Sequence, residues 1–436
     1  MTKIFSCLPT ALLTLSCFTA APSQAAESGA TPADYHLVQV LALSRHGIRA
    51  PLVNYGDALA EATPHHWPKW QTEGGLLTPK GGKVENHVGH YFHAWLAQNH
   101  LFGERGCPKG DAVFVYANSL PRTIDTAKFF LDGAFPGCDI PVNHQTAVGT
   151  MDPTFNPIIT AAVSENFKTA ALNSIAQHAG PGGIDGLNTR LKPNYQLLEQ
   201  VLDYSQSQAC QRDKRCSLAT QPSSVVLEQG KEPAITGPLR TGTGASDAFM
   251  LQYYEGFPLR DVGWGKITTP AQWRQLEAIK NLYHETLFGS PAIAANAAKP
   301  LLTFIAGALN AQPPQGERQQ AAQRAALTLL AGHDSNIASL LAAMKVRDYQ
   351  LPDQFERTPI SGAIVFQRWH DDKQNRDLMK IEYVYPTSRQ IRNDSALSLA
   401  SPPRRVTLAI DGCPLDVAGF CPMSDFKQAV MQDLRG

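Results

Sequence analysis

An apolar strand that ends in two arginines around one histidine is the feature that most constrains this chain. Residues 36–43 form an alternating apolar run, which predicts a buried strand, and they lead directly into Arg45-His46-Gly47-Ile48-Arg49-Ala50-Pro51. Each buried guanidinium needs a partner, and a planar guanidinium grips phosphate oxygens in pairs. The segment therefore predicts a site for a phosphate dianion; the alternative is an exposed basic loop with an incidental histidine.

Two later stretches also place reactive side chains directly after a predicted strand. Residues 112–117 precede a turn and a helix that carries Arg122 near its N-terminus. A cation there opposes the helix dipole, an arrangement that an anion bound between them explains. Residues 327–331 end in Gly332-His333-Asp334-Ser335-Asn336, again before a helix. Since open α/β sheets bind ligands at the carboxyl ends of their strands, we expect these residues to lie together.

These segments resemble the signature motifs of the histidine acid phosphatases. Residues 45–51 match that family's Arg-His-Gly-x-Arg-x-Pro motif, and residues 333–336 match its distal His-Asp-x-Asn motif. Similar stretches at 149–157, 251–258 and 366–371 extend the resemblance over essentially all of the mature chain. The resemblance implies an α/β fold with a central sheet flanked by helices in three layers, and an inserted, mostly helical domain.

The resemblance also implies the reaction, which is hydrolysis of phosphate monoesters through a phosphorylated histidine. His46 is the expected nucleophile. Asp334 is expected to protonate the leaving oxygen and then to activate water as a base. The expected phosphate ligands are Arg45, Arg49, Arg122 and a protonated His333. No metal ion and no other cofactor is expected.

The proton balance of this reaction predicts that activity is highest in acid. His46 must attack as the free base while Asp334 still holds a proton. Neighbouring arginines would lower the pKa of His46 and keep it neutral in acid. They would also lower the pKa of Asp334, so burial or a second carboxylate must compensate.

The expected substrate is a phosphorylated sugar, with glucose 1-phosphate favoured. Glu255, in the predicted helical domain, could accept hydrogen bonds from sugar hydroxyls and repel further phosphates; the alternative is a solvated glutamate at a helix end. Trp67 and Trp70 could stack on a sugar or pack against the core. The alternative functions are a phytase or broad-specificity acid phosphatase, a phosphosugar-binding protein and a mutase-like isomerase.

Charge and the first residues indicate the compartment. Lys plus Arg and Asp plus Glu both number 38, so we expect neither a nucleic-acid partner nor an anionic membrane surface. Residues 1–25 have the basic start, the apolar run at 11–20 and the small residues of a secretory signal peptide, cleaved after Ala25 or Ala26. That run is too short to span a bilayer. A periplasmic protein is expected, with a lipid anchor on Cys17 as the alternative.

Six cysteines remain after the signal peptide, which in an exported chain predicts disulfides. Six cysteines allow fifteen pairings, and sequence neighbours are the simplest choice. The expected pairs are Cys107–Cys138, Cys210–Cys216 and Cys413–Cys421. A cysteine metal site is a weaker alternative, because no Cys-x-x-Cys pair occurs. His65 and His66 are interpreted as solvated rather than as metal ligands.

We expect a phosphatase core in two parts, residues 26–150 and 311–436, and a helical domain at 151–310 that roofs the active site. Apolar residues recur at helical spacing around 167–178, 195–204, 247–254 and 271–287. Residues 311–319 are interpreted as a polar linker back to the sheet. The oligomeric state is left open, with a homodimer as one option.

Overall fold

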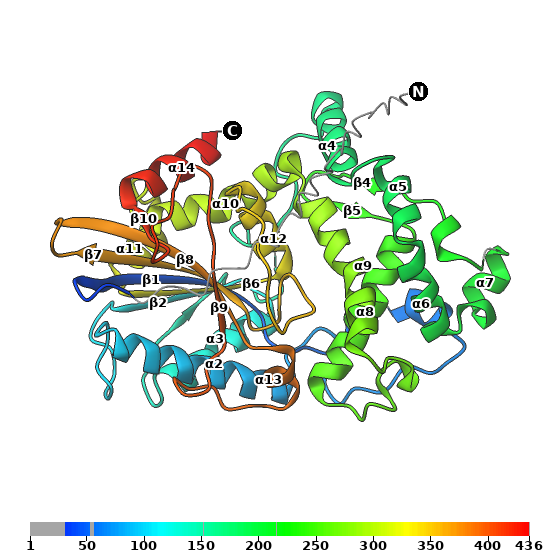
Figure 1. Ribbon diagram of the computed structural model, residues 1–436, viewed down its shortest axis with the longest axis horizontal. Helices are drawn as coiled ribbons and strands as arrows, with labels where there is room; N and C mark the ends of the chain where they lie inside the picture. The colour runs from blue at the N-terminus through cyan, green and yellow to red at the C-terminus, as the bar shows by residue number, and fades with distance from the viewer. Residues whose placement is uncertain (1–30, 53–55, 151, 215, 436) are drawn as a thin grey trace, which may run out of the picture.

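The computed structural model describes residues 31–52, 56–150, 152–214 and 216–435, so the predicted signal peptide lies outside the described residues. The described chain forms an eight-stranded sheet with helices on both faces and a second, helical part at one end (Figure 1). The strands of the sheet are β1 (Tyr35–Arg45), β2 (Val113–Ala117), β3 (Val142–Asn143), β6 (Leu327–Gly332), β7 (Ala363–Asp371), β8 (Arg376–Tyr385), β9 (Arg404–Thr407) and β10 (Cys421–Pro422). Their order is β10-β8-β7-β1-β6-β2-β3, with β9 paired to β8.

Strand β1 is the meeting point of the parallel and antiparallel halves of the sheet. It pairs in parallel with β6, so that Arg45 lies opposite Gly332, and antiparallel with β7. Strand β6 in turn pairs in parallel with β2, with Ala331 opposite Ala117. The carboxyl ends of β1, β6 and β2 therefore lie side by side, as the sequence predicts.

The two faces of β1 face two separate hydrophobic cores, because successive side chains of a strand point in opposite directions. Val40 and Ala42 pack in a core with α2 and α3, whereas Leu41 and Leu43 pack in a core with α10, α12 and α14. These helices are α2 (Pro79–Gln98), α3 (Pro121–Ala134), α10 (Pro291–Ala308), α12 (Asp334–Ala343) and α14 (Met423–Arg435). Helices on both faces of the sheet make three layers, which confirms the predicted fold class.

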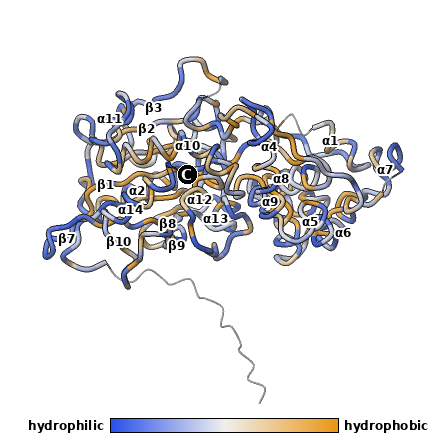
Figure 2. Tube along the Cα trace, turned by 90° about the horizontal axis from the view of Figure 1, so that it is seen from above, coloured by the Kyte–Doolittle hydropathy of each residue, from blue (hydrophilic) through white to orange (hydrophobic). Residues whose placement is uncertain are grey.

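The helical part is built around a third core, to which Val84 of α2 also belongs, and it extends from the sheet along the long axis of the molecule (Figure 2). Its elements are α1 (Gly56–Glu61), α4 (Glu165–His178), α5 (Gly183–Arg190), α6 (Lys192–Leu202), α7 (Gln208–Asp213), α8 (Pro238–Glu255), α9 (Pro270–Phe288) and the hairpin of β4 (Val225–Val226) and β5 (Ala234–Ile235). The helices predicted around 167–178, 195–204 and 271–287 are confirmed as α4, α6 and α9. The helix predicted at 247–254 is the second half of α8.

Two stretches differ from the sequence prediction. The linker expected at 311–319 already contains the start of α11 (Gly316–Arg324). Helix α10 was not predicted, because it is apolar on most of its circumference and contains Pro300, so it lacks an amphipathic stripe. Its Leu301 and Ile305 pack in the same core as Leu43, so the chain returns to the sheet before residue 310. The domain division at 150 and 310 stays a prediction.

The six cysteines form the three disulfides predicted from sequence neighbours. Their Cα–Cα distances are 5.5 Å for Cys107–Cys138, 4.6 Å for Cys210–Cys216 and 5.6 Å for Cys413–Cys421. The first bond links the loop after α2 to the end of α3. Within the described ranges, no helix is both long and apolar enough to cross a membrane.

Close contact between α2 and α3 predicts that Gly89→Ala destabilises the protein. A Cβ on Gly89 would lie 2.0 Å from the Phe130 carbonyl oxygen, which belongs to the main chain of α3. Without this clash, alanine would stabilise a helix interior. We expect the free energy of unfolding to fall by about 1–3 kcal/mol, measured by thermal or urea denaturation. Gly103→Ala is the control, since its nearest neighbour is 3.4 Å away. A Gly89→Ala protein as stable as the wild type would contradict the prediction.

Candidate functional site

The main chain at the carboxyl ends of three strands holds the predicted site residues in one place. His46 directly follows β1, and its amide donates to the Gly332 carbonyl at the end of β6 (3.0 Å). The amide of Asn118, directly after β2, donates to the Ala331 carbonyl (2.9 Å). Hydrogen bonding of the sheet therefore continues one residue beyond the strands.

A cavity of about 360 Å³ lies over these strand ends, a volume suited to a small ligand. The strand ends and the first turns of α3 and α12 line it from the sheet side. The helical part supplies Asp247 of α8, Lys280 and His284 of α9, and Glu232 of the loop between β4 and β5. Of the predicted catalytic and phosphate-binding residues, those that line the cavity are His46, Arg49, Arg122, His333 and Asp334.

The imidazole of His46 is held by a hydrogen bond at Nδ1, which leaves Nε2 free. Its Nδ1 lies 2.8 Å from the Gly47 carbonyl oxygen, which can only accept a hydrogen bond, so Nδ1 carries the proton. Burial lowers the pKa of His46 well below 6.5, and the charges of Arg122 and Arg45 lower it further. His46 is therefore neutral, with a free lone pair on Nε2, even in acid.

Arg49 and Arg122 surround the cavity with donors that the protein itself does not satisfy. Among the residues described here, the Nε atoms of both arginines are buried and have no hydrogen-bond partner. Buried unsatisfied donors are costly, so acceptor oxygens in the cavity would stabilise them. Burial and the neighbouring Arg49 lower the pKa of Arg122 to about 10, which still leaves it charged in acid. The pair forms a strong site for a phosphate group.

Arg45 is not among the residues that line the cavity, and its role as a phosphate ligand stays a prediction. Its side chain is fully buried. Nη1 donates to Glu356 Oε1 (2.8 Å) and to the Thr358 carbonyl (2.5 Å), and Nη2 lies 3.1 Å from Asp334 Oδ2. The direct effect of Arg45 in this geometry is to hold and ionise Asp334.

Asp334 is the first residue of α12, where the helix dipole favours an anion. Burial raises its pKa, but Arg45, His284 and Lys280 outweigh burial, and the net pKa lies well below 3.8. The closest approach of His284 to Asp334 is 3.9 Å, between Nε2 and Oδ2. That a neighbouring arginine lowers the pKa of Asp334 agrees with the expectation from the sequence.

His333 is in the cavity wall, where its surroundings disfavour the protonated form expected from the sequence. Burial lowers its pKa well below 6.5, and Arg122 lowers it further. The Arg122 Nη2 atom lies 3.3 Å from His333 Nδ1, a contact that favours the unprotonated nitrogen. The other ring nitrogen of His333, Nε2, lies 2.6 Å from Asn118 Nδ2.

Glu232 is a lining residue that the sequence analysis did not single out. Burial and the nearby carboxylate of Asp334 raise its pKa to about 7, although Arg122 and Arg240 oppose this shift. It is a second carboxyl group in the cavity wall, but in acid it is protonated and carries no charge that would raise the pKa of Asp334. Nothing in the flanking sequence identifies it, because it lies in a loop brought to the cavity only by the fold of the helical part.

Glu255, in contrast, does not line the cavity, and its predicted contact with a sugar is corrected. Its Oε2 accepts a hydrogen bond from Thr78 Oγ1 (2.7 Å) at the N-cap of α2. It is the last residue of α8, at the opposite end of that helix from Pro238. The Glu255 carboxylate therefore links α8 to α2.

A buried ion-pair network includes two residues of the cavity wall, Asp247 and Lys280, and was not predicted from the sequence. Lys280 Nζ donates to Asp247 Oδ1 (2.9 Å) and to Glu356 Oε1 (2.7 Å), and Asp247 Oδ2 accepts from Arg49 Nη2 (2.9 Å). Burial raises the pKa of Asp247, but Arg49 and Lys280 lower it far more. One signal was present: Lys280 lies four residues after the buried Leu276, a charge on an apolar helix face.

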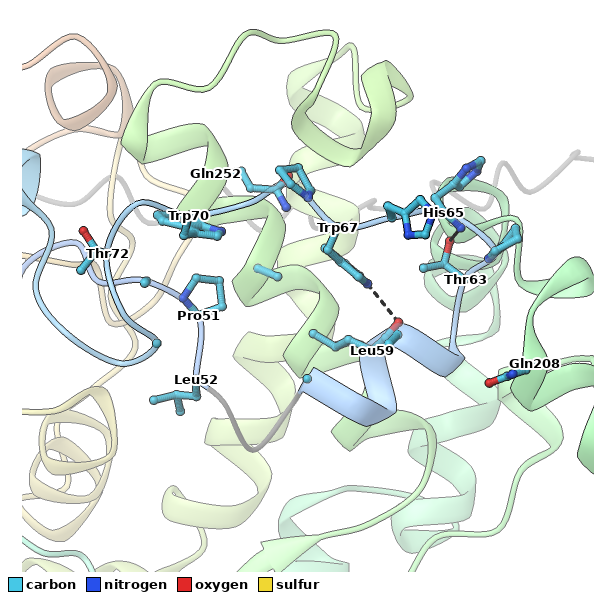
Figure 3. A pocket seen from close by; sticks show the side chains of 18 of the residues that line it. Pro51, Leu52, Leu59, Thr63, His65, Trp67, Trp70, Thr72, Gln208 and Gln252 are labelled. Carbon is cyan, nitrogen blue, oxygen red and sulfur yellow. Dashed lines mark hydrogen bonds between the residues drawn. The ribbon is translucent and has the colours of Figure 1, made fainter.

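Trp67 and Trp70 line a different cavity, of about 820 Å³, shown in Figure 3. Trp67 stacks on Phe249 and donates to the Leu59 carbonyl (3.0 Å), and Trp70 packs on Phe257. The described lining of this cavity contains no acidic side chain, lysine or arginine, and Leu52 is common to both cavities. The tryptophans thus pack against the core, one of the two readings of the sequence.

The structure gives the two adjacent histidines of this loop ordinary partners. His65 Nε2 pairs with Asp203 Oδ2 (2.5 Å), and the His66 carbonyl accepts from Trp264. Across the described parts of the chain, no three His, Cys, Asp or Glu side chains are grouped so as to hold a metal ion.

A neutral histidine between arginines, with an aspartate at the neighbouring strand end, defines an α/β enzyme that acts on phosphate groups. Comparison with known proteins agrees with this class. The family model of the histidine phosphatase superfamily (branch 2) matches residues 36–386. The chain therefore belongs to the histidine phosphatase superfamily (branch 2), and it is a phosphoric monoester hydrolase.

Individual relatives are similar over nearly the whole chain. Glucose-1-phosphatase of Salmonella typhimurium is 49% identical over 408 residues, which cover 94% of this chain and 95% of the relative. Phytase AppA of Escherichia coli is 33% identical over 399 residues, covering 90% and 91%. The apo structure of Hafnia alvei phytase has a TM-score of 0.87 and 31% identity, covering 93% of this chain and 98% of the other.

The electrostatics predict that Arg122→Gln raises the pKa of His46. Arg122 is the largest single charge effect on this imidazole, and removing a nearby positive charge makes protonation easier. The shift can be followed by NMR titration of the histidine resonances, with His46→Ala identifying the signal. Arg324→Gln, which removes an exposed arginine paired with Asp111, should leave the titration unchanged. An unchanged pKa in Arg122→Gln would contradict this account.

Proposed function

We propose that this enzyme hydrolyses sugar phosphate monoesters, with glucose 1-phosphate as the preferred substrate, through a phosphohistidine on His46. One observation carries the proposal: a neutral imidazole with a free Nε2 lines a cavity of about 360 Å³ together with Arg49, Arg122 and Asp334. A nucleophile, phosphate donors and a proton carrier within one small cavity are what a two-step phosphate transfer requires.

In the first step His46 Nε2 attacks phosphorus. A P–N bond forms while the P–O bond to the sugar breaks, and the leaving oxygen takes a proton from Asp334. Arg49 and Arg122 hold the phosphoryl oxygens and stabilise the charge that spreads over them in the transition state. The sugar leaves as a neutral alcohol.

In the second step the Asp334 carboxylate takes a proton from a water molecule. The water oxygen attacks phosphorus, the P–N bond breaks, and inorganic phosphate and free His46 are released. Because Asp334 regains a proton here, it is ready to act as the acid in the next turnover.

Asp334 can act as an acid only if its low pKa is raised when the substrate binds. A phosphate dianion bound beside Arg49 and Arg122 supplies negative charge close to the carboxyl, and this raises the pKa. Glu232, with a pKa of about 7, is itself protonated in acid and adds no negative charge there. The neutral state of His46 in acid supports a reaction that runs best below neutral pH.

The similarity to glucose-1-phosphatases supports the substrate. Two such relatives are 49% and 45% identical to this chain, compared with 33% for the phytase. Glu232 supports it as well, because a carboxyl group in the cavity wall can accept hydrogen bonds from sugar hydroxyls. Once ionised, the same group would repel a second phosphate, which disfavours inositol hexakisphosphate.

A phytase activity is the alternative within the family, and a phosphosugar-binding protein is the alternative outside it. Binding alone needs neither a free imidazole nitrogen nor an adjacent aspartate, so it is the weaker proposal. We further propose a periplasmic location after removal of residues 1–25. The three disulfides support it, because such bonds persist in oxidising compartments. A homodimer stays a prediction.

The two-step mechanism predicts different defects for His46→Ala and Asp334→Asn. His46→Ala should abolish phosphate release from glucose 1-phosphate and from an aryl phosphate. Asp334→Asn should lower kcat/KM for glucose 1-phosphate about 10²–10⁴-fold, since a sugar oxygen needs its proton. An aryl alcohol leaves without one, so the same variant should show a burst of aryl alcohol in stopped flow and accumulate phosphohistidine.

Wild-type protein and Arg324→Gln serve as controls for these variants. Full activity in His46→Ala would exclude the phosphohistidine mechanism. Equal losses on the sugar and aryl substrates in Asp334→Asn would exclude its role as the acid.

The raised pKa of Glu232 predicts how substrate preference depends on pH. Below about pH 7 the group is protonated and resembles Gln; above it, the ionised group repels a polyphosphate. We therefore expect Glu232→Gln and the wild type to have similar ratios of kcat/KM for phytate and glucose 1-phosphate at pH 5. At pH 8 the wild type should disfavour phytate more strongly than the variant does.

Comparing two proteins at each pH cancels the change in charge of phytate itself. Glu255→Gln is the matched control, because Glu255 lies outside the cavity and its loss should not alter the ratio at either pH. A Glu232→Gln ratio equal to that of the wild type at pH 8 would show that Glu232 does not discriminate between the substrates.

A further inference from the structure

One hydroxyl group connects the peptide between His46 and Gly47 to the helix that carries Arg122. Thr126 Oγ1, in the second turn of α3, accepts a hydrogen bond from the Gly47 amide (3.0 Å) and donates one to the Arg122 carbonyl (2.7 Å). The Gly47 carbonyl accepts in turn from His46 Nδ1 (2.8 Å). Gly47, His46 and Thr126 are all buried, so water does not compete for these bonds.

Every bond in this series has only one allowed direction. An amide can only donate and a carbonyl can only accept, so the Thr126 hydroxyl must accept from Gly47 and give its proton to Arg122. The same rule places the proton of His46 on Nδ1. Two consecutive peptides are therefore involved: Thr126 holds the N–H of the peptide between His46 and Gly47, and the carbonyl of the next peptide holds Nδ1, which leaves Nε2 as the free nitrogen of His46.

Helix α2 limits the movement of Gly47 on another side. A Cβ at this position would lie 3.0 Å from Glu85 and 3.0 Å from Leu77. Burial raises the pKa of Glu85 to about 8, so this neighbour is uncharged in acid and does not perturb His46 electrostatically. The contact with α2 is steric, whereas the bond from Thr126 is directional.

Hydrogen bonds from threonine to the carbonyl four residues earlier are common within helices, and the bond to Arg122 is one of them. This common helical pattern does not explain the second hydrogen bond, which Thr126 accepts from a segment 79 residues away in the sequence. Thr126 is also absent from the lining of the cavity, so it does not touch a bound phosphate directly.

We propose that Thr126 is a positioning residue for the nucleophile: its hydroxyl fixes the peptide that joins His46 to Gly47, and with it the main chain that carries the imidazole, so that His46 Nε2 is aimed at phosphorus. The inference rests on the proposed function, because it takes His46 as the nucleophile. In this proposal the buried Thr126 side chain aligns His46 Nε2 with the phosphate held by Arg122.

Two variants remove the hydroxyl and one restores it. Thr126→Val keeps the branched shape, Thr126→Ala is a smaller substitute, and Thr126→Ser keeps the hydroxyl. The matched control is Thr328→Val in β6, where a buried Thr Oγ1 also donates to a main-chain carbonyl, that of Ala322 (3.2 Å), with no bond toward the site. Thermal unfolding of all four variants measures the cost to stability.

Rapid-quench measurement of phosphohistidine formation from an aryl phosphate reports on the positioning itself. We expect Thr126→Val and Thr126→Ala to phosphorylate His46 about ten- to a hundredfold more slowly than the wild type, as small misplacements of reacting groups do. Thr126→Ser should recover most of the rate, and Thr328→Val should match the wild type. The inhibition constant of inorganic phosphate should stay the same in every variant, because both cavity arginines remain.

Three results would overturn the inference. The first is a phosphorylation rate in both hydroxyl-free variants equal to that of Thr328→Val. The second is a Thr126→Ser protein as slow as Thr126→Val. The third is a loss of phosphate binding as large as the loss of rate, which would place the effect on Arg122. Failure of the proposed function is distinguishable, since it would appear as absence of phosphohistidine in the wild type.

Discussion

The ion pairs of the buried Arg45 guanidinium are the interactions on which the rest of the site depends. A fully buried cation must be paired, and Arg45 is paired with Glu356 and Asp334. Glu356 in turn binds Lys280, which binds Asp247, which binds Arg49. One continuous series of ion pairs therefore runs from the last residue of β1 into α9 and α8 and back to the loop after β1. It connects the sheet to the helical part at the place where these two parts enclose the cavity.

This arrangement separates two tasks that both call for arginine. Arg45 has its charge neutralised by carboxylates and acts on the aspartate. Arg122 keeps unsatisfied donors in the cavity wall and acts on the phosphate and on His46. The same positive charge that attracts the substrate also keeps the nucleophile unprotonated. The charge of Arg122 thus adds to burial in keeping His46 neutral, while the helix dipole of α12 favours the ionised form of Asp334.

Sequence alone located the strand ends and most of the reactive residues, because strand, turn and helix recur there in a local pattern. Local patterns could not reveal Glu232 or Glu356, which lie in loops and reach the site only through tertiary structure. The same limit explains the error at Glu255: it lies in α8, which does form part of the roof, but at the end away from the cavity. Helix α10 was not predicted, because a helix that is buried on most sides lacks the periodic change between apolar and polar residues that marks an amphipathic helix.

The parallel pairing of β1 with β6 has a consequence for the newly made chain. Val40 lies opposite Leu327, so the central pair of strands joins segments separated by most of the sequence. The nucleophile is synthesised early, but its partner Asp334 and the strand that holds its main chain come late. A chain still being synthesised therefore carries His46 without the strand and the aspartate that complete the cavity around it, until the last third of the protein has joined the sheet.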